Sequence, residues 1–291
     1  MATLSAQSRR LSQTVGCECC GLIFAALQSG RSSLEASDKG VAPLHYQQSR
    51  DTAMPRVLIW DLPTRIFHWL LTIGFFVSAA ISVTADEDSP LFSAHMILGI
   101  VLGVMVVLRI VWGFVGTRHA RFTSFLFSPV SLMRYAFGAL KGSEPRSIGH
   151  NAGSSYAIFA MLGLLLATAV TGLMISNGNE AGEELHEIAS YLLMAVVAVH
   201  IVGVVWYSLR HKENITSSMI TGCKEASPDD AIRSSRPIVG IVFLLLISFL
   251  TVRLFQNYDR ATRTTTFPGL GITIPPGESE GSEGRGGDDN D

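Results

Sequence analysis

Four long apolar stretches and a shorter fifth one limit what this chain can fold into. They span about residues 66–83, 94–115, 156–176, 187–207 and 237–254. A helix needs roughly 20 predominantly apolar residues to cross the hydrocarbon layer of a membrane. None of the stretches alternates polar and apolar residues, as the strands of a membrane barrel do. We therefore expect an all-α integral membrane bundle of four helices, followed by a fifth transmembrane helix.

The distribution of charge predicts the orientation of this bundle. The connections after the first and third stretches, "TADEDSPLFS" and "NGNEAGEELHE", carry acids and no base. The connections after the second and fourth stretches carry five lysines and arginines each. Cationic loops stay on the cytoplasmic side of a membrane. We therefore expect a multi-pass protein with a cytoplasmic N-terminus, and with the acidic loops and the C-terminal tail outside.

Composition divides the chain into four parts. Residues 1–53 are rich in serine, glutamine and glycine, and are expected to be a disordered extension or to precede a true start at Met54. Residues 54–225 hold the four-helix domain, and residues 236–255 hold the fifth helix. Residues 256–291 are expected to be a disordered tail because they are acidic and rich in glycine.

Four histidines lie within the apolar stretches or at their margins: His68, His95, His186 and His200. Ionisable residues at membrane depth are costly and usually mark a functional path or a ligand site. His186 and His200 are fourteen residues apart, which places them on nearly the same helix face and about 21 Å apart along the axis. With the orientation above, His68 matches His200 in depth near the inner side, and His95 matches His186 near the outer side. Two histidines that face each other at one depth are what bis-imidazole haem iron requires.

Each of these signals also has a purely structural explanation. A single histidine such as His68 is as readily explained as a core residue bonded to a backbone carbonyl as it is explained as a haem ligand. The ligand explanation is favoured because four histidines lie at matched depths. Glycines stand in the stretches at positions 74, 99, 103, 163, 172 and 203. They would give a flat macrocycle room, but small residues also let membrane helices pack closely.

A cation lies at membrane depth on the same helix as one of these histidines. Arg109 follows His95 by fourteen residues, so it lies on about the same face and nearer the cytoplasm. It could pair with a haem propionate, or extend its charge to the membrane interface. His119, His150 and His211 lie in the cytoplasmic connections and are expected to be solvated.

The segments "WDLPTRIFHW", "RIVWGFVGTRHARF", "GHNAGSS", "ELHEIASYLLMAVVAVH" and "HKENITSSMITGCK" follow one another over about residues 55–225. In this order they resemble the bacterial cytochrome b-561 family, close to the b-type cytochrome subunits of nickel-iron hydrogenases. The resemblance implies a four-helix or five-helix bundle with two b haems, whose axial ligands are His68, His95, His186 and His200. The chain departs from the family pattern in "GHNAGSS", which lacks the proline that often follows the asparagine.

The resemblance also implies a function. Such cytochromes pass electrons between a periplasmic redox partner and the quinone pool of the bacterial inner membrane. The partner would be a c-type cytochrome, a hydrogenase or another dehydrogenase, and no nucleic acid is expected. Two alternatives stay open: a stand-alone superoxide or quinone oxidoreductase, and a haem-free transporter with a histidine proton relay. The transporter hypothesis predicts inverted repeats or interrupted helices, and the sequence shows neither.

Overall fold

The computed structural model describes residues 54–274, except residues 87, 88, 263 and 270. The extension predicted over residues 1–53 lies outside the described residues. Five long helices dominate the described part: α3 (Leu62–Thr84), α4 (Pro90–Val115), α6 (Ala152–Ser176), α7 (Ala181–His211) and α9 (Pro237–Gln256). Each is long and apolar enough to cross a membrane. The predicted all-α membrane bundle with a fifth spanning helix is confirmed.

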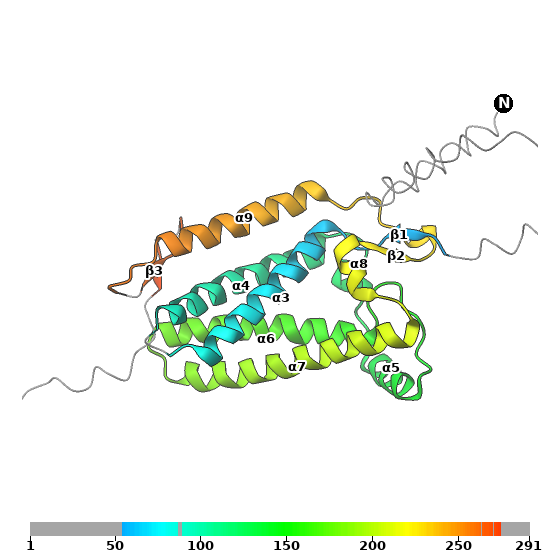
Figure 1. Ribbon diagram of the computed structural model, residues 1–291, viewed down its shortest axis with the longest axis horizontal. Coiled ribbons are helices and arrows are strands. Elements are labelled where there is room, and N and C mark those ends of the chain that lie inside the picture. The colour runs from blue at the N-terminus through cyan, green and yellow to red at the C-terminus, as the bar shows by residue number, and fades with distance from the viewer. Residues whose placement is uncertain (1–53, 87–88, 263, 270, 275–291) are drawn as a thin grey trace, which may run out of the picture.

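Shorter elements gather at the two ends of the bundle (Figure 1). One end, which we call the α5 end, holds α5 (Pro129–Lys141), α8 (Ile215–Thr221) and strand β1 (Arg56–Leu58), which pairs antiparallel with β2 (Cys223–Glu225). At the other end, the hairpin end, β3 (Thr265–Thr266) pairs antiparallel with β4 (Thr273–Ile274). Two 3₁₀ helices, η1 (Phe122–Ser124) and η2 (Pro228–Asp230), lie in the connections.

Polar caps set where the spanning helices begin. Asp61 caps α3 by accepting a hydrogen bond from the backbone N–H of Thr64 at 2.8 Å. Ser89 caps α4, and a proline follows the cap in the first turn of both helices. Asn151 and Ser154 form a reciprocal capping box at the start of α6. Caps and early prolines satisfy or remove the free N–H groups of a first turn, so these sites fix how each helix enters the bundle.

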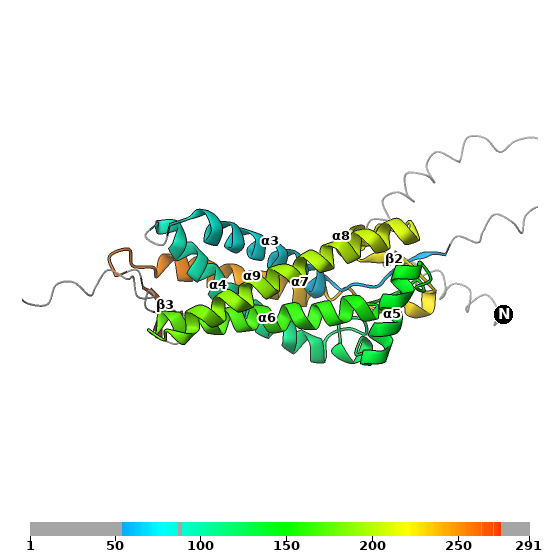
Figure 2. The same ribbon diagram turned by 90° about the horizontal axis from the view of Figure 1, so that it is seen from below.

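The helices pack side by side, with α9 on the outside (Figures 1 and 2). α3 packs along α4, α4 against α6, and α6 along α7, whereas α3 and α7 make hardly any contact over their described residues. α9 covers α3 and α4, and a buried cluster with Phe67, Met105 and Leu254 lies between these three helices. The helices that carry the four histidines are thus held together mainly through α4 and α6.

Large apolar side chains cover the outside of the bundle. Leu209 is 74% exposed, Ile238 is 76% exposed and Val202 is 67% exposed. Side chains of this kind are unfavourable in water but are solvated by lipid tails in a bilayer. The exposed surface therefore agrees with a multi-pass membrane protein.

The prediction of a disordered tail over residues 256–291 is wrong for its first part. Tyr258 and Phe267 pack against the cluster between α3, α4 and α9, and the Thr265 hydroxyl donates to the Leu254 carbonyl at 2.8 Å. The strands β3 and β4 then close a hairpin up to Ile274. The overall composition of the tail concealed a few apolar side chains that bury against the helices. The remainder, residues 275–291, lies outside the described residues.

Candidate haem sites

The predicted outer pair lies together near the hairpin end. His95 stands early on α4 and His186 early on α7, and the centres of the two rings are 6.2 Å apart with their planes at 75°. A metal ion bonded to two imidazole nitrogens at about 2 Å each leaves the ring centres about 6 Å apart. The observed spacing therefore fits one metal ion held between the rings.

Neighbouring helices orient both outer rings. The Nδ1 of His95 lies 3.0 Å from the backbone carbonyl of Ser78 on α3 and 3.0 Å from its hydroxyl. The Nδ1 of His186 lies 3.0 Å from the hydroxyl of Thr171 on α6, which itself donates to the Ala167 carbonyl at 2.8 Å. A carbonyl only accepts, and the Thr171 proton is already used, so both Nδ1 atoms act as donors. Each Nε2 then keeps its lone pair, which is the arrangement that a metal-binding histidine needs, because a hydrogen bond at one ring nitrogen fixes the tautomer and the orientation of the ring.

Sequence reasoning did not identify Ser78 and Thr171. Both are hydroxyl side chains within apolar spans and both are buried. A buried hydroxyl at membrane depth needs a partner, so a search for such residues near the histidines could have found them.

The predicted inner pair lies on α3 and α7. His68 and His200 are both half-buried and interact electrostatically. The Nδ1 of His68 is buried and has no hydrogen-bond partner among the described residues. α3 and α7 hardly touch each other along their described lengths, so the two histidines stand on helices that do not pack directly together.

The glycines of the spans divide into two groups. A Cβ built on Gly74 would lie 2.8 Å from a Leu102 side-chain carbon, and one built on Gly103 would lie 2.8 Å from the Ala169 Cβ. These two glycines allow close helix packing. A Cβ on the glycines at positions 99, 163 and 203 would meet nothing within 4 Å, so the packing of the described helices does not require glycine at these three positions.

Arg109 is buried inside the protein and does not extend to an interface. It is 6% exposed, its guanidinium stacks 5.4 Å from the Phe122 ring centre, and its Nη2 donates to the Ala120 carbonyl at 3.3 Å. Its Nη1 is buried without a partner among the described residues. A buried guanidinium with a free N–H is suited to a carboxylate.

A buried carboxylate near Arg109 was also missed. Asp61 is 1% exposed and accepts hydrogen bonds from Trp112 Nε1 at 3.3 Å and from the Thr117 hydroxyl at 2.5 Å, in addition to its capping bond. It interacts electrostatically with Arg109. The only sequence signal was an acid directly before an apolar span, in "WDLP".

The three histidines predicted to be solvated are packed into the α5 end, so that prediction is wrong. The His150 ring lies between Trp60 at 4.8 Å and Phe125 at 4.5 Å, measured between ring centres. Burial, helped by the charge of Arg109, lowers the pKa of His150 to about 3. His119 and His211 are likewise half-buried. The connections fold back over the helix ends, which loop composition alone does not reveal.

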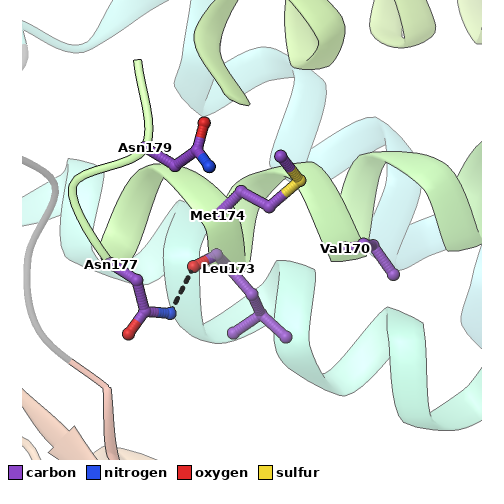
Figure 3. A pocket seen from close by; sticks show the side chains of 5 residues that line it. All are labelled: Val170, Leu173, Met174, Asn177 and Asn179. Carbon is purple, nitrogen blue, oxygen red and sulfur yellow. Dashed lines mark hydrogen bonds between the residues drawn. The ribbon is translucent and has the colours of Figure 1, made fainter. Parts of the chain in front are cut away.

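Two surface recesses lie away from the four histidines. A recess of about 340 Å³ at the end of α6 is lined by Val170, Leu173, Met174, Asn177 and Asn179 (Figure 3). There the Asn177 side chain donates to the Leu173 carbonyl at 2.7 Å. A second, mainly apolar groove of about 480 Å³ runs between α4, α6 and the β3–β4 hairpin. None of the four histidines lines either one, so both are surface features of the bundle.

Comparison with known proteins gives a consistent result. Residues 59–222 match the sequence profile of prokaryotic cytochrome b561. The chain is 26% identical over 236 residues to a probable Ni/Fe-hydrogenase B-type cytochrome subunit of Bradyrhizobium diazoefficiens, which covers 64% of this chain and 95% of the relative. It is 27% identical to the protein of that name in Rhizobium leguminosarum bv. viciae, over 57% of this chain and 87% of the relative.

A more distant relative has a similar name. The probable Ni/Fe-hydrogenase 1 B-type cytochrome subunit of Escherichia coli strain K12 is 22% identical, over 60% of this chain and 93% of the relative. The family implies haem b and membrane electron transfer, in agreement with five apolar helices. The family match extends over more than half of the residues of this chain. The chain therefore belongs to the prokaryotic cytochrome b561 family.

Proposed function

We propose that this chain holds two b haems and passes electrons between a periplasmic redox partner and the quinone pool of a bacterial inner membrane. The observation that carries the proposal is the His95–His186 pair, whose 6.2 Å ring spacing fits a shared metal ion. The hydrogen bonds at both Nδ1 atoms support it further. Bound haem iron would supply one-electron redox chemistry, which these side chains do not have themselves.

The chain's own residues hold and orient the cofactors in this proposal. His95 and His186 bind the outer haem, and His68 and His200 bind the inner one. Arg109, with its buried and unpartnered Nη1, pairs with a propionate of the inner haem. The quinone reacts beside this inner haem.

The name shared by the relatives favours a hydrogenase as the redox partner. A c-type cytochrome or another dehydrogenase is the alternative partner class. Four exposed glutamates at the hairpin end offer an acidic docking surface at the start of α7: Glu180, Glu183, Glu184 and Glu187. With the cationic α5 end in the cytoplasm, this surface faces the periplasm.

The haem content of the purified protein tests this function. We expect a b-type spectrum in the reduced-minus-oxidised difference and two haems per chain. His68→Ala should remove the inner haem and leave one haem per chain, because the outer pair is built from other residues. A wild-type protein with a single haem would contradict the two-haem proposal, and one without a b-type spectrum would contradict it entirely.

A further inference from the structure

A buried carboxyl group faces a histidine at the α5 end. The Glu144 side chain, which follows α5, is 1% exposed, and its Oε1 lies 3.6 Å from the Nε2 of His211 at the end of α7. Neither carboxyl oxygen of Glu144 nor the Nε2 of His211 has a hydrogen-bond partner among the described residues. A buried carboxylate is unfavourable unless a cation or a proton neutralises it. The His211 ring is therefore the side chain placed to share a proton with this carboxyl group.

The other charged groups near this pair are engaged elsewhere. Arg146 lies 2.9 Å from a Glu213 carboxylate oxygen, and Lys224 lies 3.4 Å from the other oxygen of the same group. The Arg210 guanidinium donates to the Gly142 carbonyl. Within 4.0 Å of the Glu144 carboxyl, His211 is the only cationic side chain in the described part of the chain.

Two tyrosines complete the titratable surroundings. The Tyr207 ring centre lies 4.3 Å from that of His211, and its hydroxyl accepts from the backbone N–H of Ser147 at 2.8 Å. Burial, followed by the charge of Glu144, raises the pKa of Tyr135 on α5. Neither tyrosine supplies a positive charge, so neutralisation of Glu144 rests on His211 or on a bound proton.

The pair is aligned with the proposed inner haem ligand. Tyr207 follows His200 by seven residues and His211 follows it by eleven, and both spacings return to within about 20° of the same helix direction. His200, Tyr207 and His211 thus share one face of α7. The pair lies about 16 Å nearer the α5 end than His200 along this helix. The His211 side chain is 14% exposed, so it reaches both water and the buried carboxyl.

We propose that Glu144 and His211 form a proton-transfer pair that delivers protons from cytoplasmic water to a quinone reduced at the inner haem. This inference rests on the proposed function. Reduction of one quinone to quinol takes two electrons, which the periplasmic donor supplies through the haems, and two protons. Each proton enters at the exposed edge of His211, passes through the pair and bonds to a quinone oxygen, and the pair regains its starting protonation. When quinol is oxidised instead, the protons leave by the same groups.

The test follows haem oxidation in the full-length, haem-loaded protein. Haems are reduced with limiting dithionite and then mixed with duroquinone. Glu144→Gln keeps the size of the side chain, but the amide cannot accept and release a proton as the carboxyl group does. We therefore expect about tenfold slower haem oxidation with an unchanged haem spectrum and haem content. The rate of the variant should fall steeply as pH rises, since hydronium from solution must replace the pair, whereas the wild-type rate changes little between pH 6 and 8. A structural role alone would not produce that change in pH profile.

Controls separate this inference from the proposed function. Glu225→Gln removes a carboxyl at the same end that is 58% exposed and lies 3.6 Å from Arg146, and it should oxidise at the wild-type rate. His211→Asn should reproduce the slow oxidation and serves as the second variant if Glu144→Gln does not fold. Wild-type oxidation in either folded variant overturns the proton-transfer pair. Failure of duroquinone to oxidise the wild-type haems contradicts the proposed function instead.

Discussion

At the scale of single residues, two buried hydroxyl groups determine how the outer histidines present their nitrogens. Ser78 and Thr171 come from α3 and α6, while the rings come from α4 and α7. All four helices of the bundle therefore meet at this site. A ring held at Nδ1 loses little rotational freedom when Nε2 binds a metal, which raises the affinity for the cofactor.

Thr171→Val tests the orienting role of this hydroxyl. The variant keeps the side-chain shape but removes the hydroxyl oxygen that accepts from the Nδ1–H of His186. Loss of such a partner typically weakens a metal site by about 10-fold to 100-fold, so we expect weaker binding of the outer haem in a haem titration of the apoprotein. Thr251→Val is the matched control, because among the described residues the Thr251 hydroxyl bonds only the Ile247 carbonyl on its own helix. Equal haem affinity in both variants would contradict the assigned role.

His150 links stability to pH. Its pKa is lowered from 6.5 to about 3 by burial, with a smaller effect from Arg109. Between these values the unfolded chain binds a proton at this ring and the folded chain does not, so stability falls as pH falls from about 6.5 towards 3. His150→Phe keeps an aromatic ring between Trp60 and Phe125 and should make this fall shallower. Thermal unfolding in detergent at a series of pH values measures it, and identical pH profiles would contradict the prediction.

At the scale of helices, α7 carries one member of each histidine pair and α9 carries none. α7 is the longest helix of the described residues, and its 31 residues allow His186 and His200 to sit at two depths on one face. α9 instead packs on α3 and α4 through Ile247, Leu250 and Leu254. Its packing supports the two helices that carry His68 and His95.

Removal of residues 237–291 tests whether α9 only packs against the other helices or also shapes a haem site. We expect the truncated protein to keep both haems and to unfold at a lower temperature, because the buried side chains of α9 no longer cover Phe67. Haem content and thermal unfolding in detergent measure the two effects. Loss of a haem on truncation would show that α9 shapes a cofactor site. Unchanged thermal stability would show that its packing contributes little.

At the scale of the whole molecule, charge is distributed unevenly between the two ends. The α5 end carries cations such as Arg118, Arg134 and Lys141, whereas the start of α7 at the hairpin end carries exposed glutamates. By the positive-inside rule, we propose that the α5 end faces the cytoplasm. Proton uptake and partner docking are thus proposed for opposite sides of the membrane.

Reporter fusions test this orientation. Alkaline phosphatase is active only outside the cytoplasm, so we expect activity when it is fused after residue 291 and none when it is fused after Lys141. A cytoplasmic reporter such as a fluorescent protein should give the reverse pattern. Phosphatase activity at Lys141 would invert the predicted topology and would move the proposed quinone and partner sites to the opposite sides.

The sequence was sufficient to predict the transmembrane helices and the polar residues that lie within them. A run of about 20 apolar residues has one stable form in a bilayer, because a helix satisfies its own backbone hydrogen bonds. The depth of His95 and of His186 follows from counting along such helices, and the structure brings these two rings together. The assignment of all four histidines as haem ligands stays a prediction.

The sequence alone determined the membrane bundle, the order of its helices and the depths of its histidines, because these depend on composition and regular helix geometry. Only the tertiary structure decided which polar groups are buried together: Ser78 with His95, Thr171 with His186, Asp61 near Arg109, and Glu144 with His211. It also ordered the hairpin that composition had assigned to disorder. These contacts join residues that are far apart in the chain or lie in loops. The path of a loop depends on its packing against other elements, and it lacks the regular repeat by which positions along a helix can be predicted.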